Sequence, residues 1–296
     1  MKKKPITKIK LKNSLEYSKL IKNRLLKSIH LDKKKIGGLM MNGYFKKSQR
    51  NTPLISIVMP NYKSKILSKS LNSLFNQSYK NLEIIVIDGN SGKNTIKILN
   101  KYTNKIDLWI SENDEGMWHA WNKGLKLARG DFVGVVDSSN ILYKNAIKIL
   151  VKYITKYPNV DFICGAIKKD GKLYAGYKPE KIYKHFNVIP SSVVSLFIKN
   201  SSLKKTGYLN LKYKIQTDQD LIYRMIVKHK FVGINTKSSE VFGDLGFSGF
   251  SKRHSFFKIL MNEINIRVNN NQNYLIILFI VIGRSFVKLI NYFKKL

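Results

Sequence analysis

Acidic residues are scarce in this chain of 296 residues. Aspartate and glutamate together number 18, against 54 lysines and arginines, which gives a formal net charge of +36. A coding preference for lysine explains many cations, but it does not explain so few acids. A surface of one sign attracts partners of the opposite sign. The composition therefore points to an anionic partner, which is a nucleotide, a lipid diphosphate, an acidic membrane surface or a nucleic acid.

Cysteine is almost absent. Cys164 is the single one, which excludes a disulfide within the chain and any metal site built from several cysteines. A lone cysteine also suits a reducing compartment.

Long apolar runs are missing as well. The lysine-rich start is not followed by an apolar stretch, so we expect no secretory signal. The longest apolar run, residues 274–282, is well short of the ~20 residues that a spanning helix needs. Extending it to Phe293 would include Arg284 and Lys288. We therefore expect an amphipathic helix that lies on a membrane surface or is buried, rather than one that crosses a membrane.

The first fifty residues are strongly basic. They contain 16 lysines and arginines against Glu16 and Asp32, a net charge of +14. Apolar residues recur at helical spacing between Ser14 and Leu31, which predicts a basic amphipathic helix. Residues 1–50 are therefore predicted to be a helical extension. It either packs on the main domain or lies on a membrane surface, and the sequence leaves both open.

From residue 54 onward, short β-rich runs alternate with helical stretches. This alternation predicts an α/β fold, a Rossmann-like and mostly parallel sheet with helices on both faces. We expect one domain over residues 51–250 and a basic helical appendage over residues 251–296. The predicted strands are residues 54–59, 82–88, 108–111, 131–137, 161–167 and 192–199, with part of a hairpin over 172–177. The predicted helices are residues 65–77, 93–102, 117–129, 144–157 and 218–229.

Polar clusters follow the first strands at their carboxyl ends. They are residues 60–62, 88–91, 112–115 and 137–140. In open α/β sheets, ligands bind beyond the carboxyl ends of the strands. Clusters that follow successive strands should therefore meet at one edge of the sheet and form a binding site.

Six segments, in this order, carry a family resemblance. They read SIVMPNY (56–62), SLNSLFNQSYKNLEIIVIDGNS (70–91), WISENDEG (109–116), NKGLKLARGD (122–131), LFIK (196–199) and TDQDLIYR (217–224). The chain resembles the family 2 glycosyltransferases of the GT-A fold, especially bacterial enzymes of cell-surface polysaccharide synthesis. The resemblance implies transfer of a sugar, with inversion, from a nucleotide-diphosphate sugar to a polysaccharide or lipid-linked acceptor. Because the terminal segments are basic and would be held near anionic lipid, we expect a cytoplasmic enzyme that is peripherally associated with the inner face of the membrane.

The resemblance also implies site residues. Those expected to bind the nucleotide sugar are Pro60, Tyr62, Asp88, Ser91, Lys123 and Asp137. Two of them have simpler interpretations, because Asp88 can cap the helix that starts near Asn94 and Lys123 can be a solvated lysine. For the base that takes the acceptor proton we predict Asp218, with Asp220 in support. The alternative is that both acids complement the dipole of the helix they begin.

A divalent cation, Mg²⁺ or Mn²⁺, is the cofactor that the resemblance implies. The tetrad that holds it reads Asp137-Ser138-Ser139-Asn140, so Asp137 and Asn140 are the candidate ligands. A neutral amide oxygen binds such a cation more weakly than a carboxylate does. A catalytically degenerate nucleotide-sugar-binding relative is therefore the alternative function. A nucleic-acid-binding protein, suggested by charge alone and by no recognition motif, is a third.

Overall fold

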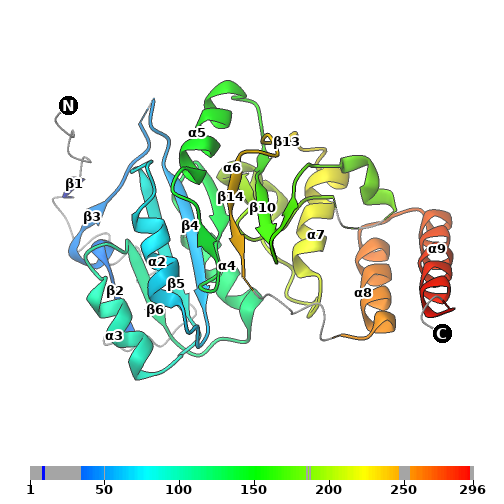
Figure 1. The fold of residues 1–296 in the computed structure, drawn as a ribbon, viewed down its shortest axis with the longest axis horizontal. Coiled ribbons are helices and arrows are strands. Elements are labelled where there is room, and N and C mark those ends of the chain that lie inside the picture. The colour runs from blue at the N-terminus through cyan, green and yellow to red at the C-terminus, as the bar shows by residue number, and fades with distance from the viewer. Residues whose placement is uncertain are drawn as a thin grey trace.

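The computed structural model describes residues 9–10, 35–49, 51–184, 186, 188–246 and 254–293. Within them lies an eight-stranded sheet of order β13-β9-β12-β7-β4-β5-β6-β2 (Figure 1). Its centre is formed by β4 (Ile55–Asn61), β5 (Leu82–Asp88), β6 (Leu108–Ser111) and β7 (Phe132–Val135). These strands are apolar without alternation and completely buried, as expected for a sheet with both faces covered.

The central strands pair in parallel: β4 with β5 and β7, and β5 with β6. Their connections contain α2 (Leu67–Phe75), α3 (Lys93–Lys101) and α4 (Met117–Leu127). Each strand and helix lies within a few residues of its predicted range. The predicted α/β fold with helices flanking a Rossmann-like sheet is confirmed for this part of the chain.

The second half makes the sheet mixed. Here β12 (Leu196–Lys199) is antiparallel to both β7 and β9 (Phe162–Cys164), and β13 (Gly233–Asn235) is parallel to β9. A four-stranded sheet of order β11-β10-β14-β8 lies beside it. Its strands are β8 (Ile141–Leu142), β10 (Ala166–Lys169), β11 (Lys172–Tyr174) and β14 (Val241–Leu245). The helices of this half are α5 (Ala146–Lys156), α6 (Asn200–Thr206) and α7 (Thr217–Tyr223).

Three predicted elements have different boundaries. Residues 161–167 are two strands, β9 and β10, which belong to different sheets. Of residues 192–199 only 196–199 are a strand, because Val194 has a φ of 67° and residues 191–195 form a hydrogen-bonded turn. The helix predicted over 218–229 is α7 followed by a π-helical turn, Arg224–Lys228.

The basic N-terminal segment is described only in part. The helix predicted over residues 14–31 lies outside the described residues. Further along, β2 (Ile36–Gly37) pairs antiparallel with β6, and Phe45 of β3 (Tyr44–Phe45), which pairs with β1 (Ile9–Lys10), is buried in the main core. Between them, residues Leu39–Asn42 form a short 3-10 helix. Residues 36–45 therefore add the outermost strand of the sheet.

Two helices, α8 (Phe256–Asn269) and α9 (Tyr274–Phe293), follow the mixed half. Figure 1 shows them side by side beyond α7, at the end of the molecule opposite β2. On α8, Glu263 and Arg267 are completely buried and form an ion pair with a 2.9 Å separation. Most large apolar side chains of α9 are instead exposed. Among the described residues, no helix combines the length and apolarity needed to span a membrane.

Candidate functional site

A cavity of about 1090 Å³ opens at the carboxyl ends of the central strands. All four predicted polar clusters contribute to it, with Pro60 and Tyr62 after β4, Gly89 after β5, Asp114 after β6 and Asp137 after β7. Parallel strands bring these loops together because they end at the same edge of the sheet. The predicted convergence of the four clusters is thus observed.

The loop after β4 forms one wall of this cavity. Tyr62 keeps 65% of its surface exposed. Lys63 places its ammonium 5.0 Å from the centre of the Tyr62 ring. Lys63 and Lys65 both line the cavity. An exposed aromatic ring beside two cations suits a ligand that has a flat base and negative charge.

Asp88 does not line the cavity. Its carboxylate is completely buried and accepts hydrogen bonds from Asn61 Nδ2 at 2.6 Å, from Ser111 Oγ at 2.6 Å and from both the backbone and hydroxyl of Ser91. Ser91 Oγ also accepts from the backbone N–H of Lys63 at 2.8 Å. Asp88 and Ser91 therefore position the loops after β4 and β5, and a ligand contact by either stays a prediction.

Asp114 is a lining carboxylate that the sequence analysis did not single out. Gly89 gives it room, because a Cβ at that position would lie 2.8 Å from Asp114 Oδ2. Its other oxygen accepts from Gly116 N at 3.0 Å, just before α4 begins. Asp114 could have been identified from the sequence, because it belongs to the polar cluster at residues 112–115. Lys123, by contrast, forms an ion pair with Glu112 and does not line the cavity.

Asp137 and Asp218 are close enough for their charges to interact. The pKa of Asp137 is raised from 3.8 to about 7, mainly by burial; the indole of Trp121 partly offsets this shift, and the charge of Asp218 adds to it. Burial also raises the pKa of Asp218, although Ser192 Oγ donates to its carboxylate at 2.6 Å. Asp218 is the second residue of α7, and Asp137 is the second residue after β7. Asp137 lines the cavity, whereas Asp218 does not and reaches the site through its charge interaction with Asp137.

Asn140 does not line the cavity. It is completely buried, and its side-chain oxygen accepts from Gly246 N at 2.7 Å. Among the described residues, no group of three histidine, cysteine or acidic side chains is placed to hold a metal ion. Asp137 is thus the remaining member of the predicted ligand pair at the cavity. Asp137 by itself does not fit a divalent cation held by carboxylates of the protein. The divalent cation therefore stays a prediction from the sequence.

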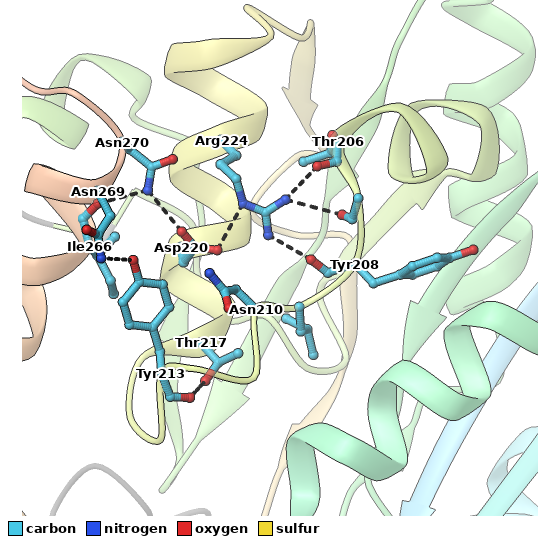
Figure 2. A network of polar contacts seen from close by, with 12 residues as sticks. Thr206, Tyr208, Asn210, Tyr213, Thr217, Asp220, Arg224, Ile266, Asn269 and Asn270 are labelled. Atoms are coloured by element: carbon cyan, nitrogen blue, oxygen red, sulfur yellow. Dashed lines mark hydrogen bonds and ion pairs between the residues drawn. The ribbon is translucent and has the colours of Figure 1, made fainter. Parts of the chain in front are cut away.

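Asp220 is buried and does not line the cavity. Its carboxylate is 2.9 Å from Arg224 Nε and accepts from Asn270 Nδ2 at 3.0 Å. Arg224 in turn donates to the carbonyl oxygens of Thr206 and Tyr208, as Figure 2 shows. Asp220 therefore fastens α7 to the end of α8 and to the loop after α6. Its predicted support of catalysis stays a prediction.

Comparison with known proteins places these observations in a family context. The sequence model described as "Glycosyl transferase family 2" matches residues 56–226. The chain is similar to an uncharacterized glycosyltransferase of Rickettsia typhi, with 29% identity over 194 residues, 61% of each chain. It is also similar to the Escherichia coli UDP-Glc:α-D-GlcNAc-diphosphoundecaprenol β-1,3-glucosyltransferase WfgD. That identity is 34% over 114 residues, 38% of this chain and 45% of WfgD. The chain thus spans about three fifths or less of the length of these relatives.

A solved structure shares the architecture. Residues 1–349 of Staphylococcus aureus TarS, in complex with UDP-GlcNAc, align with a TM-score of 0.60 and 20% identity. The alignment covers 77% of this chain and 71% of that one. At this identity the likeness establishes the fold, and it confirms the GT-A architecture expected from the sequence.

Proposed function

This chain belongs to glycosyl transferase family 2, and on that premise we propose that it transfers a sugar from a nucleotide-diphosphate sugar to an acceptor hydroxyl. The observation that carries the proposal is the cavity at the carboxyl ends of β4 to β7. One set of groups in its lining is an exposed aromatic ring with two lysines, and a second is the Asp137 carboxylate, which interacts electrostatically with Asp218 of α7. A nucleotide diphosphate matches the first set, and a reacting hydroxyl matches the second.

Asp218 is proposed to act as the base. The acceptor oxygen attacks the anomeric carbon, the bond from that carbon to the diphosphate breaks, and the proton of the acceptor hydroxyl moves to the Asp218 carboxylate. The nucleoside diphosphate leaves with the bonding electrons. Attack from the side opposite the leaving group inverts the anomeric carbon, as the family resemblance implies.

Negative charge grows on the departing diphosphate and has to be neutralised. Lys63 and Lys65 line the cavity and are exposed on the loop after β4. Because Asn140 does not line the cavity, these ammonium groups are the cationic alternative that the lining offers. We propose that they, rather than a cluster of metal-bound carboxylates, stabilise the leaving group.

The acceptor is proposed to be a lipid-linked or polysaccharide sugar on the cytoplasmic side of a membrane. Two observations support this. The printed name of WfgD gives a sugar on diphosphoundecaprenol as its acceptor. The net charge of +36 favours residence near anionic lipid.

Calorimetric titration with UDP, GDP and their common sugar conjugates tests the proposal, with EDTA and then with Mn²⁺. We expect one nucleotide to bind in EDTA. The variant Tyr62→Ala should weaken that binding about tenfold, because stacking of a base on an aromatic ring contributes ~1–3 kcal/mol. Tyr62 is 65% exposed, so its removal should not affect folding.

Tyr174→Ala is the matched control. Tyr174 lies on β11, is 43% exposed and does not line the cavity. It should leave the affinity for nucleotide unchanged. Absence of binding to every nucleotide, with or without Mn²⁺, would contradict the proposed function, and binding that requires Mn²⁺ would contradict the proposed role of the lysines.

A further inference from the structure

A second cavity, of about 1000 Å³, lies where α9 and α8 meet the first turn of α7. We call it the helical groove. Its walls are mainly aromatic and aliphatic, with Phe186 and Ile215 on the domain side, Phe256 on α8, and Ile276 and Phe279 on α9. Phe279 keeps 72% of its surface exposed. A large apolar surface that water reaches is a characteristic of sites that bind a partner.

The charged residues that line the helical groove are all basic. They are Lys184, Arg284 and Lys288, and no acidic side chain belongs to the lining. The Lys288 ammonium lies 4.8 Å from the centre of the Phe256 ring. Arg284 pairs with the buried carboxylate of Glu263, which also pairs with Arg267, so the cluster keeps an excess of positive charge. The groove therefore matches a ligand that has an apolar chain and an anionic group.

The first turn of α7 connects this groove with the cavity at the carboxyl ends of β4 to β7, which we call the nucleotide cavity. Gln216 and Gln219 line the groove, while Asp218, between them, interacts with Asp137 of the nucleotide cavity. Asn262 of α8 donates to the Ile215 carbonyl oxygen at 2.5 Å, which ties α8 to this turn. The groove and the proposed base therefore share this turn of α7.

We propose that the helical groove binds the apolar chain and the phosphate of a lipid-linked acceptor. The chain lies between α8 and α9, and the phosphate lies against Lys184, Arg284 and Lys288. A second copy of the chain fits less well, because two molecules that each have a formal charge of +36 repel one another. The role as acceptor rests on the proposed transferase function, whereas lipid binding in the groove does not.

Binding of farnesyl phosphate, below its aggregation concentration, to the full chain tests the proposal. We expect saturable binding that Phe279→Ser weakens about tenfold or more, because a phenyl group loses its contact with the chain. Phe257→Ser is the matched control, since Phe257 is 69% exposed on α8 and does not line the groove. It should change the affinity by less than about twofold.

A second pair of variants tests the phosphate contact. Lys288→Gln should weaken binding of farnesyl phosphate but not of farnesol, whereas Lys258→Gln, outside the groove, should affect neither. Equal effects of Phe279→Ser and Phe257→Ser would overturn the proposal. So would recruitment to phosphatidylglycerol vesicles without any binding of farnesyl phosphate, because that result assigns the apolar face to the membrane.

Titration of the same preparations with nucleotide separates the two proposals. Failure of nucleotide binding with intact binding of farnesyl phosphate would refute the transferase function and keep the groove. Intact nucleotide binding without binding of farnesyl phosphate would refute lipid binding in the helical groove and leave the proposed transferase function standing.

Discussion

Asp218 and Asp220 are two residues apart on α7, yet their carboxylates have different surroundings. Asp218 accepts from Ser192 and interacts with Asp137 at the cavity, while Asp220 is buried against Arg224 and Asn270. On a helix, residues two apart lie on different faces. Asp218 is therefore the acid that we propose for the chemistry, whereas Asp220 helps to hold the fold together.

Substitution of each acid by its amide separates the two roles. Asp218→Asn should lower the rate of sugar transfer by about 10²–10⁴-fold, because the amide cannot accept the proton. Its melting temperature and its affinity for nucleotide should stay close to those of the parent. Asp220→Asn should instead lower the melting temperature, because it removes one partner of a buried ion pair. A fall in activity for Asp220→Asn alone, at unchanged stability, would reverse the assignment.

Glu83 makes the stability of the protein depend on pH. Burial, and then the charge of Asp107, raise its pKa from an ordinary 4.5 to about 7, while Ser56 and Arg129 oppose the shift. Between pH 4.5 and pH 7, Glu83 is therefore protonated in the folded state but ionised in the unfolded state. The stabilising contribution of its bound proton is complete below about pH 4.5 and disappears as pH rises through 7.

The variant Glu83→Gln should lack this dependence. Relative to the parent, its free energy of unfolding should increase between pH 4.5 and pH 7, by on the order of 1.4 kcal/mol for each unit of pKa difference. Urea denaturation of both proteins across this range measures the difference. A constant difference at all pH values would show that Glu83 titrates normally in the folded state.

The sequence predicted part of the site at this scale. Pro60, Tyr62 and Asp137 line the cavity as expected, because they follow strands whose ends the parallel sheet brings together. The orientations of Asp88 and Asn140 were not predictable. Each is determined by hydrogen bonds to distant residues, for example Gly246, 106 positions after Asn140.

At the scale of elements, α4 packs unusually closely on the central sheet. A Cβ on Gly124 would lie 2.2 Å from Val58 Cγ1, so the helix can approach β4 because this side chain is absent. The contact fixes the helix that begins at the edge of the nucleotide cavity. Gly283 of α9 offers a comparison, because a Cβ there would meet nothing within 4 Å.

Two glycine variants test this contact. Gly124→Ala should reduce the free energy of unfolding by about 1–3 kcal/mol, since the added methyl group forces α4 and β4 apart. Gly283→Ala should not destabilise the protein, and it should favour α9 by up to about 1 kcal/mol. Thermal denaturation of the two variants measures both effects. Equal stability of Gly124→Ala and the parent would mean that α4 and β4 are not in close contact.

The regular βαβ half was predictable from hydrophobic patterning, and the second half was less so. The strand expected over residues 161–167 breaks at Gly165, where a Cβ would lie 2.3 Å from the Phe242 ring. That neighbour is far along the chain, so a local pattern cannot reveal the break. Likewise, nothing near Ile36 indicates its pairing with Ile110.

The charge of the whole molecule affects every binding measurement. At +36 it will attract duplex DNA whatever its function is. We expect this binding to weaken by orders of magnitude between about 50 and 200 mM salt, as phosphate contacts of low specificity do. Nucleotide binding that also relies on stacking against Tyr62 should change far less. DNA binding that survives about 200 mM salt would restore the nucleic-acid-binding alternative.

The order of strands in the large sheet has a consequence for biosynthesis. At one end of the sheet, β2 is synthesised before its partner β6. The outer edge of β6 can therefore be covered as soon as Leu108–Ser111 leaves the ribosome. At the opposite edge, β9 ends at Cys164 and its partner β13 begins only at Gly233, 69 residues later. At about 5–20 residues per second, that edge is open for roughly 3–14 s. An uncovered strand is a template for aggregation, so the nascent chain is most in need of chaperones during this interval.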